Sequence, residues 1–430
     1  MTLIEKSPLK TIIAQMIKSV LLLLPIAVTA LPSYANSFTA KRAGQGFTAL
    51  TQDFTSALSN PALLTKFDSD DDVFVSLNLG VMTSDKYNVI DTTEGIGDNL
   101  NKLVEDIDNI EKKDFQSPVE DLDYSDNLYG QVDNIVADFE SIDKKTIKIR
   151  NGINLQIIIP NKHLSLGLFT NQYGRLGGFV DYNEEDENKL NNAIDNCLNP
   201  ISIKPCGLVL DDLESATLAV GYSISEAGIM AAYPLIKNPN YDLSVGTKLK
   251  YQRIDLYYNR AAVSDFDDDD FEITDDDYIT DENGTNIDLG LYVAWGDERR
   301  WSAALVTNNL VGKTVQHADQ DITFTLESSA TFGLSYQNSW ISLATEIDLT
   351  DRETFSNLSA SRYIGVGAEF RVYKPIQFRI GYRKDLNDID DHIYTAGIGV
   401  SPWDVFSMDI AAFTGDNDTL GAALQLSLKI

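Results

Sequence analysis

Residues that could act as catalysts are scattered along this 430-residue chain. The three histidines, His163, His317 and His392, fall on different segments, and none has a partner at a useful spacing. A Ser/His/Asp set can be drawn from any chain this rich in serine and aspartate, so such a set carries little information. We therefore expect no enzyme activity, with a surface lipase or protease as the least favoured alternative.

Acidic side chains cluster in three runs, at 68–72, 265–277 and 385–391. The second run is not an EF-hand loop, because its sixth position is Asp270 and its twelfth is Asp276, where glycine and glutamate are required. We expect no cofactor. The weak cation candidates are Asp267, Asp268, Asp269 and Asp270, where loosely bound Ca²⁺ or Mg²⁺ is an alternative to a solvated, repulsive loop.

The formal net charge of the chain is −31, so we expect no nucleic-acid partner, because phosphates would be repelled. Hydrophobic residues make up 43% of the chain and are regularly spaced, which argues against a wholly disordered protein. We therefore expect the segments between the charged runs to be folded.

These elements are predicted to be strands, because apolar residues alternate with polar or small ones from residue 73 onward. In the last segment, Leu424, Leu426, Leu428 and Ile430 share one face, while Gln425, Ser427 and Lys429 share the other. Short connections such as 373–375 alternate with long ones such as 258–286. Tight turns at one end and long loops at the other are typical of an outer-membrane barrel, whereas a soluble β-sandwich or propeller is the competing interpretation.

The pattern predicts an all-β transmembrane protein, an antiparallel outer-membrane β-barrel of about fourteen strands. Predicted strands include 286–296, 323–337 and 419–430, and the connection 183–212 is assigned to the outer side. Two amphipathic helices, at 95–112 and 128–143, are expected in an insertion over 93–145 between the first two strands. Its interpretation is a decorated loop or, alternatively, a lid or partner surface.

The N-terminal residues resemble a secretory signal. Lysines precede an apolar run from Val20 to Leu31, and small residues lead to a cleavage site near Ala35. We divide the chain into a signal over 1–35, an N-terminal plug over 36–70 and a barrel over 71–430. Outer-membrane lipid and lipopolysaccharide are the expected partners, and both termini are expected in the periplasm.

Export places the two cysteines, Cys197 and Cys206, in an oxidising compartment. We predict that they form a disulfide within the outer connection 183–212. The chain has no Cys-x-x-Cys motif, which excludes a thiol redox role of the thioredoxin kind.

Basic residues lie on strand faces opposite the apolar ones and are predicted to point into the lumen. These lumen candidates, together with one acid, are Lys248, Lys250, Glu369, Arg371, Arg379 and Arg383. Such a stripe could hold the carboxylate of a fatty-acid-like substrate. The alternative is a set of internal ion pairs with Glu369 and plug residues.

The segment before the first strand ends in Asn60-Pro61-Ala62-Leu63-Leu64 and resembles the plug of FadL-like outer-membrane proteins. A closer resemblance, to the TraF-like branch labelled as conjugal transfer proteins, rests on several pieces in order: 60–67, 159–162, 250–253, 266–271, 381–386 and 395–399. The resemblance implies a plugged channel for passive uptake of hydrophobic or amphipathic small molecules. The alternative is a structural component of a conjugal transfer or envelope assembly.

Overall fold

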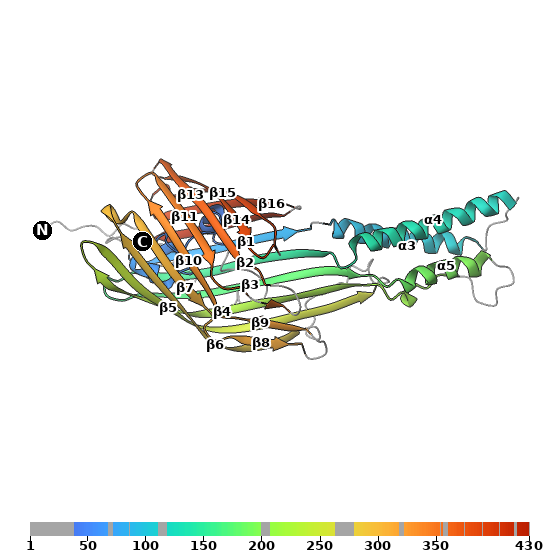
Figure 1. The fold of residues 1–430 in the computed structure, drawn as a ribbon, viewed down its shortest axis with the longest axis horizontal. Coiled ribbons are helices and arrows are strands. Elements are labelled where there is room, and N and C mark those ends of the chain that lie inside the picture. The colour runs from blue at the N-terminus through green and yellow to red at the C-terminus, as the bar shows by residue number, and fades with distance from the viewer. Residues whose placement is uncertain are drawn as a thin grey trace, which may run out of the picture.

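The computed structural model describes most of the chain beyond residue 37. The described residues are 38–67, 72–85, 87–110, 118–198, 207–262, 279–317, 322–352, 354–355, 360–373, 375–388, 390–403, 405–416 and 419–429. The predicted signal over 1–35 and the acidic residues Asp267, Asp268, Asp269 and Asp270 lie outside them. Figure 1 shows a long barrel with helices beyond one end.

Fourteen antiparallel strands close into the barrel, as the alternation predicted. Each pairs with its neighbour along the chain, and β1 pairs with β17, with Leu77 opposite Leu426. Closure pairs every edge, which a lipid environment requires. The barrel strands are β1 (Phe74–Ser84), β2 (Thr146–Ile159), β3 (Ser165–Asp181), β4 (Ala216–Lys237), β5 (Tyr241–Ala262), β6 (Ile279–Trp295), β7 (Trp301–Asn308), β10 (Ser329–Gln337), β11 (Ile341–Asp348), β13 (Tyr363–Tyr373), β14 (Ile376–Asp385), β15 (Ile393–Val400), β16 (Phe406–Gly415) and β17 (Leu420–Lys429).

The wall is apolar outside and polar inside. On β6, Leu289 points outward and is 47% exposed, whereas its neighbour Asp288 is fully buried in the lumen. On β14, Ile380 is 54% exposed and Arg379 only 3%. A soluble protein has the opposite arrangement, so the outer face fits lipid and the lumen collects the charges.

Large aromatic side chains mark the end with short turns. Trp301, Trp340, Tyr373 and Trp403 lie in or beside these turns and are exposed. Such rings sit at the headgroup level of outer-membrane barrels, where one edge is apolar and the other wet. The first strand begins and the last strand ends at this same end.

The opposite end carries a small sheet that the sequence pattern did not predict. It consists of β8 (Lys313–Gln316), β9 (Thr323–Leu326) and β12 (Thr354–Phe355). The prediction of one strand over 323–337 was wrong, because β9 belongs to this small sheet and only β10 joins the barrel. Apolar residues keep the same parity across the break, yet Phe324 is buried and Phe332 faces outward. Periodicity alone therefore could not reveal the division.

Three helices extend beyond this end of the barrel (Figure 1). They are α3 (Val89–Asp108), α4 (Pro118–Ile142) and α5 (Glu185–Leu198). Both α3 and α4 were predicted, although α4 begins ten residues earlier than expected. Their inner faces bury Leu100, Val132 and Phe139 against Leu190 and Ile194 of α5. Sequence analysis missed α5, because few of its residues are apolar. No helix in the described part of the chain has the length and apolar content needed to cross a membrane.

Residues 38–67 lie inside the barrel and are called the plug below. They contain α2 (Ala40–Gly44) and two short 3-10 helices, η1 (Phe54–Ser56) and η2 (Pro61–Thr65). Almost all of these residues are buried although none forms a strand. The plug is the blue segment within the barrel in Figure 1.

Candidate functional site

The plug spans the lumen from one wall to the other. Helix α2 contacts β1 and the strands β14 to β17, whereas η2 contacts β3, β4, β5 and β6 on the other side. Any solute that crosses the barrel must therefore pass the plug. The contacts that hold the plug are the first part of the candidate site.

The plug backbone packs directly against two glycines of the barrel wall. A Cβ atom on Gly381 would lie 2.1 Å from the backbone nitrogen of Gly46, and one on Gly367 would lie 2.3 Å from the carbonyl oxygen of Gln45. Gly46 itself has a φ of 64°, a left-handed conformation that glycine adopts without strain. Only glycine lets the plug backbone lie directly on the wall here.

Asn60 and Pro61 begin η2 and anchor the other side of the plug. The Asn60 side chain accepts a hydrogen bond from the Ala62 backbone nitrogen at 3.0 Å, which caps the helix. Its Nδ2 donates to the carbonyl oxygen of Leu50 at 2.9 Å and to that of Leu291 at 3.3 Å. This asparagine thus joins two parts of the plug to β6.

Glu346 on β11 is a buried acceptor for the plug. Its carboxylate accepts hydrogen bonds from the backbone nitrogens of Ala49 and Leu50, the latter at 2.5 Å. Arg42 of α2 donates to the other carboxylate oxygen at 3.2 Å. One wall carboxylate therefore holds two segments of the plug, and sequence analysis did not single it out.

Lys248 and Lys250 of β5 point inward and are almost fully buried. Both contact Asp288 of β6, at 2.8 Å and 3.0 Å, and Lys250 also contacts Glu226 of β4 at 2.8 Å. Lys248 donates a further hydrogen bond to the carbonyl oxygen of Leu58 in the plug at 2.9 Å. These lysines are neutralised by wall carboxylates of β4 and β6, whereas the ion-pair alternative named Glu369 and plug residues as the partners.

Arg379, Glu369 and Arg371 lie toward the end with short turns. Arg379 contacts Glu369 at 2.7 Å and Asp409 at 2.6 Å, and Arg371 contacts Glu369 at 2.8 Å. These side chains, with Lys41 and Asp53 of the plug, line a cavity of about 240 Å³ on this side of the plug. Three carboxylates line this cavity (Asp53, Glu369 and Asp409), together with two arginines and the lysines Lys41 and Lys429.

A second cavity, of about 110 Å³, lies on the side of the plug away from the short turns and is called the outer cavity below. Five arginines line it: Arg42, Arg150, Arg175, Arg352 and Arg383. Arg175 and Arg150 contact Asp390 of the outer loop, the former at 3.7 Å, and Arg352 contacts Asp348 at 2.8 Å. Burial opposes ionisation of Asp390, but Arg150, Arg175 and Lys148 outweigh it and hold its pKa well below the usual range.

Arg383 differs from the other lumen candidates because it makes no salt bridge within the described residues. Its guanidinium stacks on the rings of Phe47, at 3.9 Å, and Tyr363, at 4.4 Å. Its Nε and Nη2 atoms are buried and have no hydrogen-bond partner among the described residues. Phe47 has a φ of 62°, which is rare for a bulky residue and indicates a constrained position.

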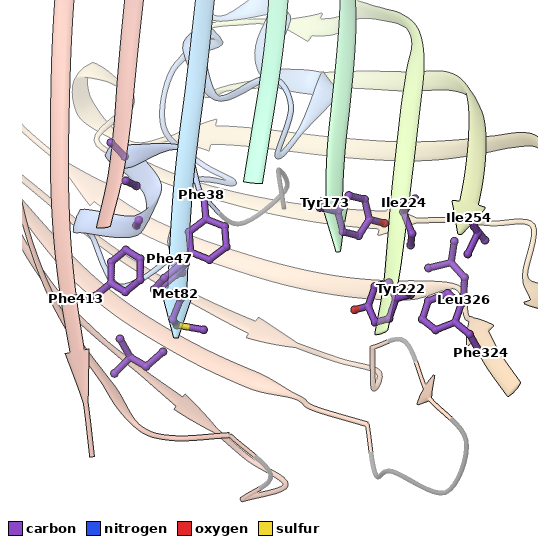
Figure 2. Close-up of a cluster of buried hydrophobic side chains, with 14 of the residues drawn as sticks. Phe38, Phe47, Met82, Tyr173, Tyr222, Ile224, Ile254, Phe324, Leu326 and Phe413 are labelled. Carbon is purple, nitrogen blue, oxygen red and sulfur yellow. The ribbon is translucent and has the colours of Figure 1, made fainter. Parts of the chain in front are cut away.

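A group of buried apolar side chains, drawn in Figure 2, contributes residues to the same cavity as the arginines. Phe38, Phe47 and Met82 lie near Phe413 on one side, and Tyr173 and Tyr222 lie near Phe324 on the other. The rings of Tyr222 and Phe324 are 4.2 Å apart. Phe38, Met82, Tyr173 and Tyr222 also line the outer cavity, so it combines apolar walls with cationic groups.

Of the remaining sequence candidates, Cys197 lies in the last turn of α5, packs against the helical core and is disulfide-bonded. Its predicted partner Cys206 and the acidic residues 267–270 lie outside the described residues, so the predicted pairing stays a prediction. Within the described residues, no group of three or more His, Cys, Asp or Glu side chains is arranged to hold a metal ion. The carboxylates that sequence analysis missed, including Glu226 and Glu346, come from strand positions whose partners only the closed barrel defines.

The closed wall, the apolar outer face and the internal plug define a plugged outer-membrane β-barrel. The family model described as "F plasmid transfer operon, TraF, protein" matches residues 57–348. The chain belongs to this family, as the TraF-like resemblance predicted.

Solved structures are similar in fold at low sequence identity. The Ralstonia pickettii toluene transporter TbuX is 11% identical with a TM-score of 0.51, covering 94% of this chain and 100% of that one. A Pseudomonas aeruginosa FadL homologue is 11% identical with a TM-score of 0.45, covering 93% and 98%. The Pseudomonas putida toluene transporter TodX is 11% identical with a TM-score of 0.46, covering 93% and 97%. No curated protein matches the sequence.

Proposed function

We propose that this protein is a plugged channel for the passive uptake of hydrophobic or amphipathic small molecules across the outer membrane. The observation that carries the proposal is the plug itself, seated between a cavity on its outer side and a cavity on the side of the short turns. Both termini lie in the periplasm in this proposal, and a shift of the plug joins the two cavities.

Support comes from the hydrogen bonds between plug and wall, which accompany apolar contacts such as that of Leu50 with Ala304 and Val306. Glu346 and Asn60 hold the plug through hydrogen bonds, and the glycine approaches add close packing but little side-chain contact. Hydrogen bonds of this kind exchange with water at a modest net cost, so the plug can shift without unfolding the wall. The wall is closed by its own strand pairs and does not need the plug for closure.

A reversible crosslink tests whether the plug controls passage. A Cβ atom on Gly333 would lie 3.1 Å from the Cβ atom of Leu50, so an outward shift of a few tenths of an ångström brings the pair into the roughly 3.5–4.5 Å range of a disulfide. In proteoliposomes, the oxidised Leu50→Cys/Gly333→Cys variant should lose flux of toluene and decanoate, and reduction should restore it. Wild-type protein with and without reductant is the control. If wild type passes neither solute faster than protein-free liposomes do, the channel proposal fails.

A second candidate function is a structural role in a conjugal transfer or envelope assembly. The helices α3, α4 and α5 favour it, because they form their own buried core beyond the barrel and present a separate surface. Replacing residues 89–142 by a short glycine linker should leave solute flux unchanged in either case. A loss of conjugation or of envelope integrity in cells, with normal flux, would favour the structural role.

A further inference from the structure

We propose that the outer cavity is a binding site for a small aromatic acid, whose carboxylate pairs with Arg383 and whose ring lies against Phe38, Tyr173 and Tyr222. This inference rests on the proposed function only in treating the acid as a transported solute. The binding site itself is argued from its charge, its unsatisfied donors and its size.

The charge of the cavity is opposite to that of the chain. Five arginines line it, and the carboxylates in contact with them among the described residues are Glu346, Asp348 and Asp390. The five arginines therefore outnumber these three carboxylates by two, and Lys148 also contacts Asp390, in a chain whose formal net charge is −31. Buried cations of one sign repel each other, and an anion in their midst relieves that repulsion.

Arg383 supplies the donors for such an anion. It is only 5% exposed, and its Nε and Nη2 lack hydrogen-bond partners among the described residues. Leaving buried charged donors unsatisfied is costly. Stacking on Phe47 and Tyr363 fixes the plane of the guanidinium, so its fork is preorganised for the two oxygens of a carboxylate.

The size and the lining of the cavity indicate what the part of the ligand beyond its carboxylate is. Its volume of about 110 Å³ is well below the few hundred Å³ of sites for drug-sized ligands, which indicates a single small ring. Tyr173, Tyr222 and Phe38 line the same cavity as the arginines and provide its aromatic walls. An inorganic anion would leave these faces unused, and a neutral hydrocarbon would leave Arg383 unpaired.

Calorimetric titration of purified full-length protein in detergent tests the assignment, with benzoate, benzyl alcohol and inorganic phosphate as probes. Benzoate should bind at least about tenfold more tightly than benzyl alcohol, because only the acid pairs with Arg383. Phosphate should bind more weakly than benzoate. Equal binding of benzoate and benzyl alcohol would overturn the anion site, and phosphate as tight as benzoate would overturn the aromatic acid in favour of a phosphate or lipid-headgroup ligand.

The Arg383→Gln variant should weaken benzoate at least about tenfold and leave benzyl alcohol unchanged. Arg300→Gln is the matched control, because Arg300 pairs with Glu298 in an exposed turn. Full benzoate affinity in Arg383→Gln would overturn the proposal. The comparison of probes on wild type decides the question if this variant does not fold. Benzoate binding without flux in proteoliposomes would remove the channel function but leave the site, so the two failures are distinguishable.

Discussion

Individual buried carboxylates in the lumen each bind groups from distant parts of the chain. Glu346 accepts hydrogen bonds from Leu50 and Arg42 of the plug, and Asp288 contacts both Lys248 and Lys250. Removing one member of a buried ion pair leaves the other buried without a partner. Substitution of such a residue therefore changes stability more than substitution of a surface charge. Their substitution should therefore separate plug seating from wall stability.

Glu346→Gln should loosen the plug without opening the wall. The amide keeps the shape but loses the charge that pairs with Arg42 and strengthens the bonds from Ala49 and Leu50. Loss of charged hydrogen bonds corresponds to about 1.5–3 kcal/mol of plug seating. Single-channel recordings should show more frequent open events than in wild type. Glu298→Gln, in an exposed turn, is the control, and identical recordings from all three proteins would contradict the role of Glu346.

Asp186 should make the docking of α5 sensitive to acid. Burial opposes its ionisation, but hydrogen bonds from Ser215 and Glu214, and a bond from Lys189, outweigh burial and lower its pKa. A carboxyl with a lowered pKa stabilises the fold above its pKa in the unfolded chain, near 3.8, and this contribution is lost as the pH falls through the lower folded value.

Hydrogen exchange of the α5 amides, corrected for intrinsic rates, measures this effect. Protection should be constant from pH 7 to pH 5 and fall below pH 4. The Asp186→Asn variant should show reduced protection at pH 7 and little further change in acid. Asp211→Asn, at an exposed position, should behave as wild type. Equal protection of wild type and Asp186→Asn at pH 7 would contradict the assignment.

At the scale of elements, the plug and the wall are held by different interactions. The wall strands pair with one another around the whole barrel, whereas the plug contributes no strand to it. The plug is seated by hydrogen bonds, by the ion pair of Arg42 with Glu346, by close backbone approaches at glycines such as Gly381, and by apolar contacts with the wall such as that of Leu50 with Val306. The wall should therefore tolerate loss of the plug.

Deletion of residues 36–60 from the exported chain should leave a folded barrel that still shifts its mobility on heating in detergent gels. Permeability to small sugars in liposome swelling should rise, because the deletion removes η1 and also α2, which contacts β1 and β14 to β17 in the lumen. Substitution of residues 36–60 by a glycine–serine segment of equal length controls for chain length. Loss of heat-modifiability in both variants would show that the wall needs the plug to fold.

At the scale of the whole molecule, lipid covers the outer face of the strands and the plug covers part of their inner face. Outward residues such as Leu289 stay exposed in the isolated chain and are covered by lipid. Leu289→Arg should therefore destabilise the barrel by about 2–4 kcal/mol, the cost of a cation near the middle of the bilayer. Trp301→Arg, in the aromatic girdle, should cost at most about 1 kcal/mol. Denaturant unfolding in lipid vesicles measures both, and equal costs would contradict the proposed membrane position.

The sequence by itself determined the wall. Alternation with a period of two is local and follows directly from lipid on one face and the lumen on the other, so the strands, their faces and the short-turn end were predictable from segments such as 420–429. The plug was predicted by resemblance around Asn60 and Pro61 rather than by periodicity. Helices α3 and α4 were predictable because each carries an apolar stripe.

Only the tertiary structure decided which charges meet. Arg42, Arg150, Arg352 and Arg383 come from positions far apart in the chain, and barrel closure brings them to one cavity. The partners of Lys250 depend on the register of β5 with β4 and β6, which local pattern does not specify. The same holds for β9, which keeps the parity of β10 yet leaves the wall. Pairing and burial are properties of the closed barrel, because they depend on neighbours that are distant in sequence.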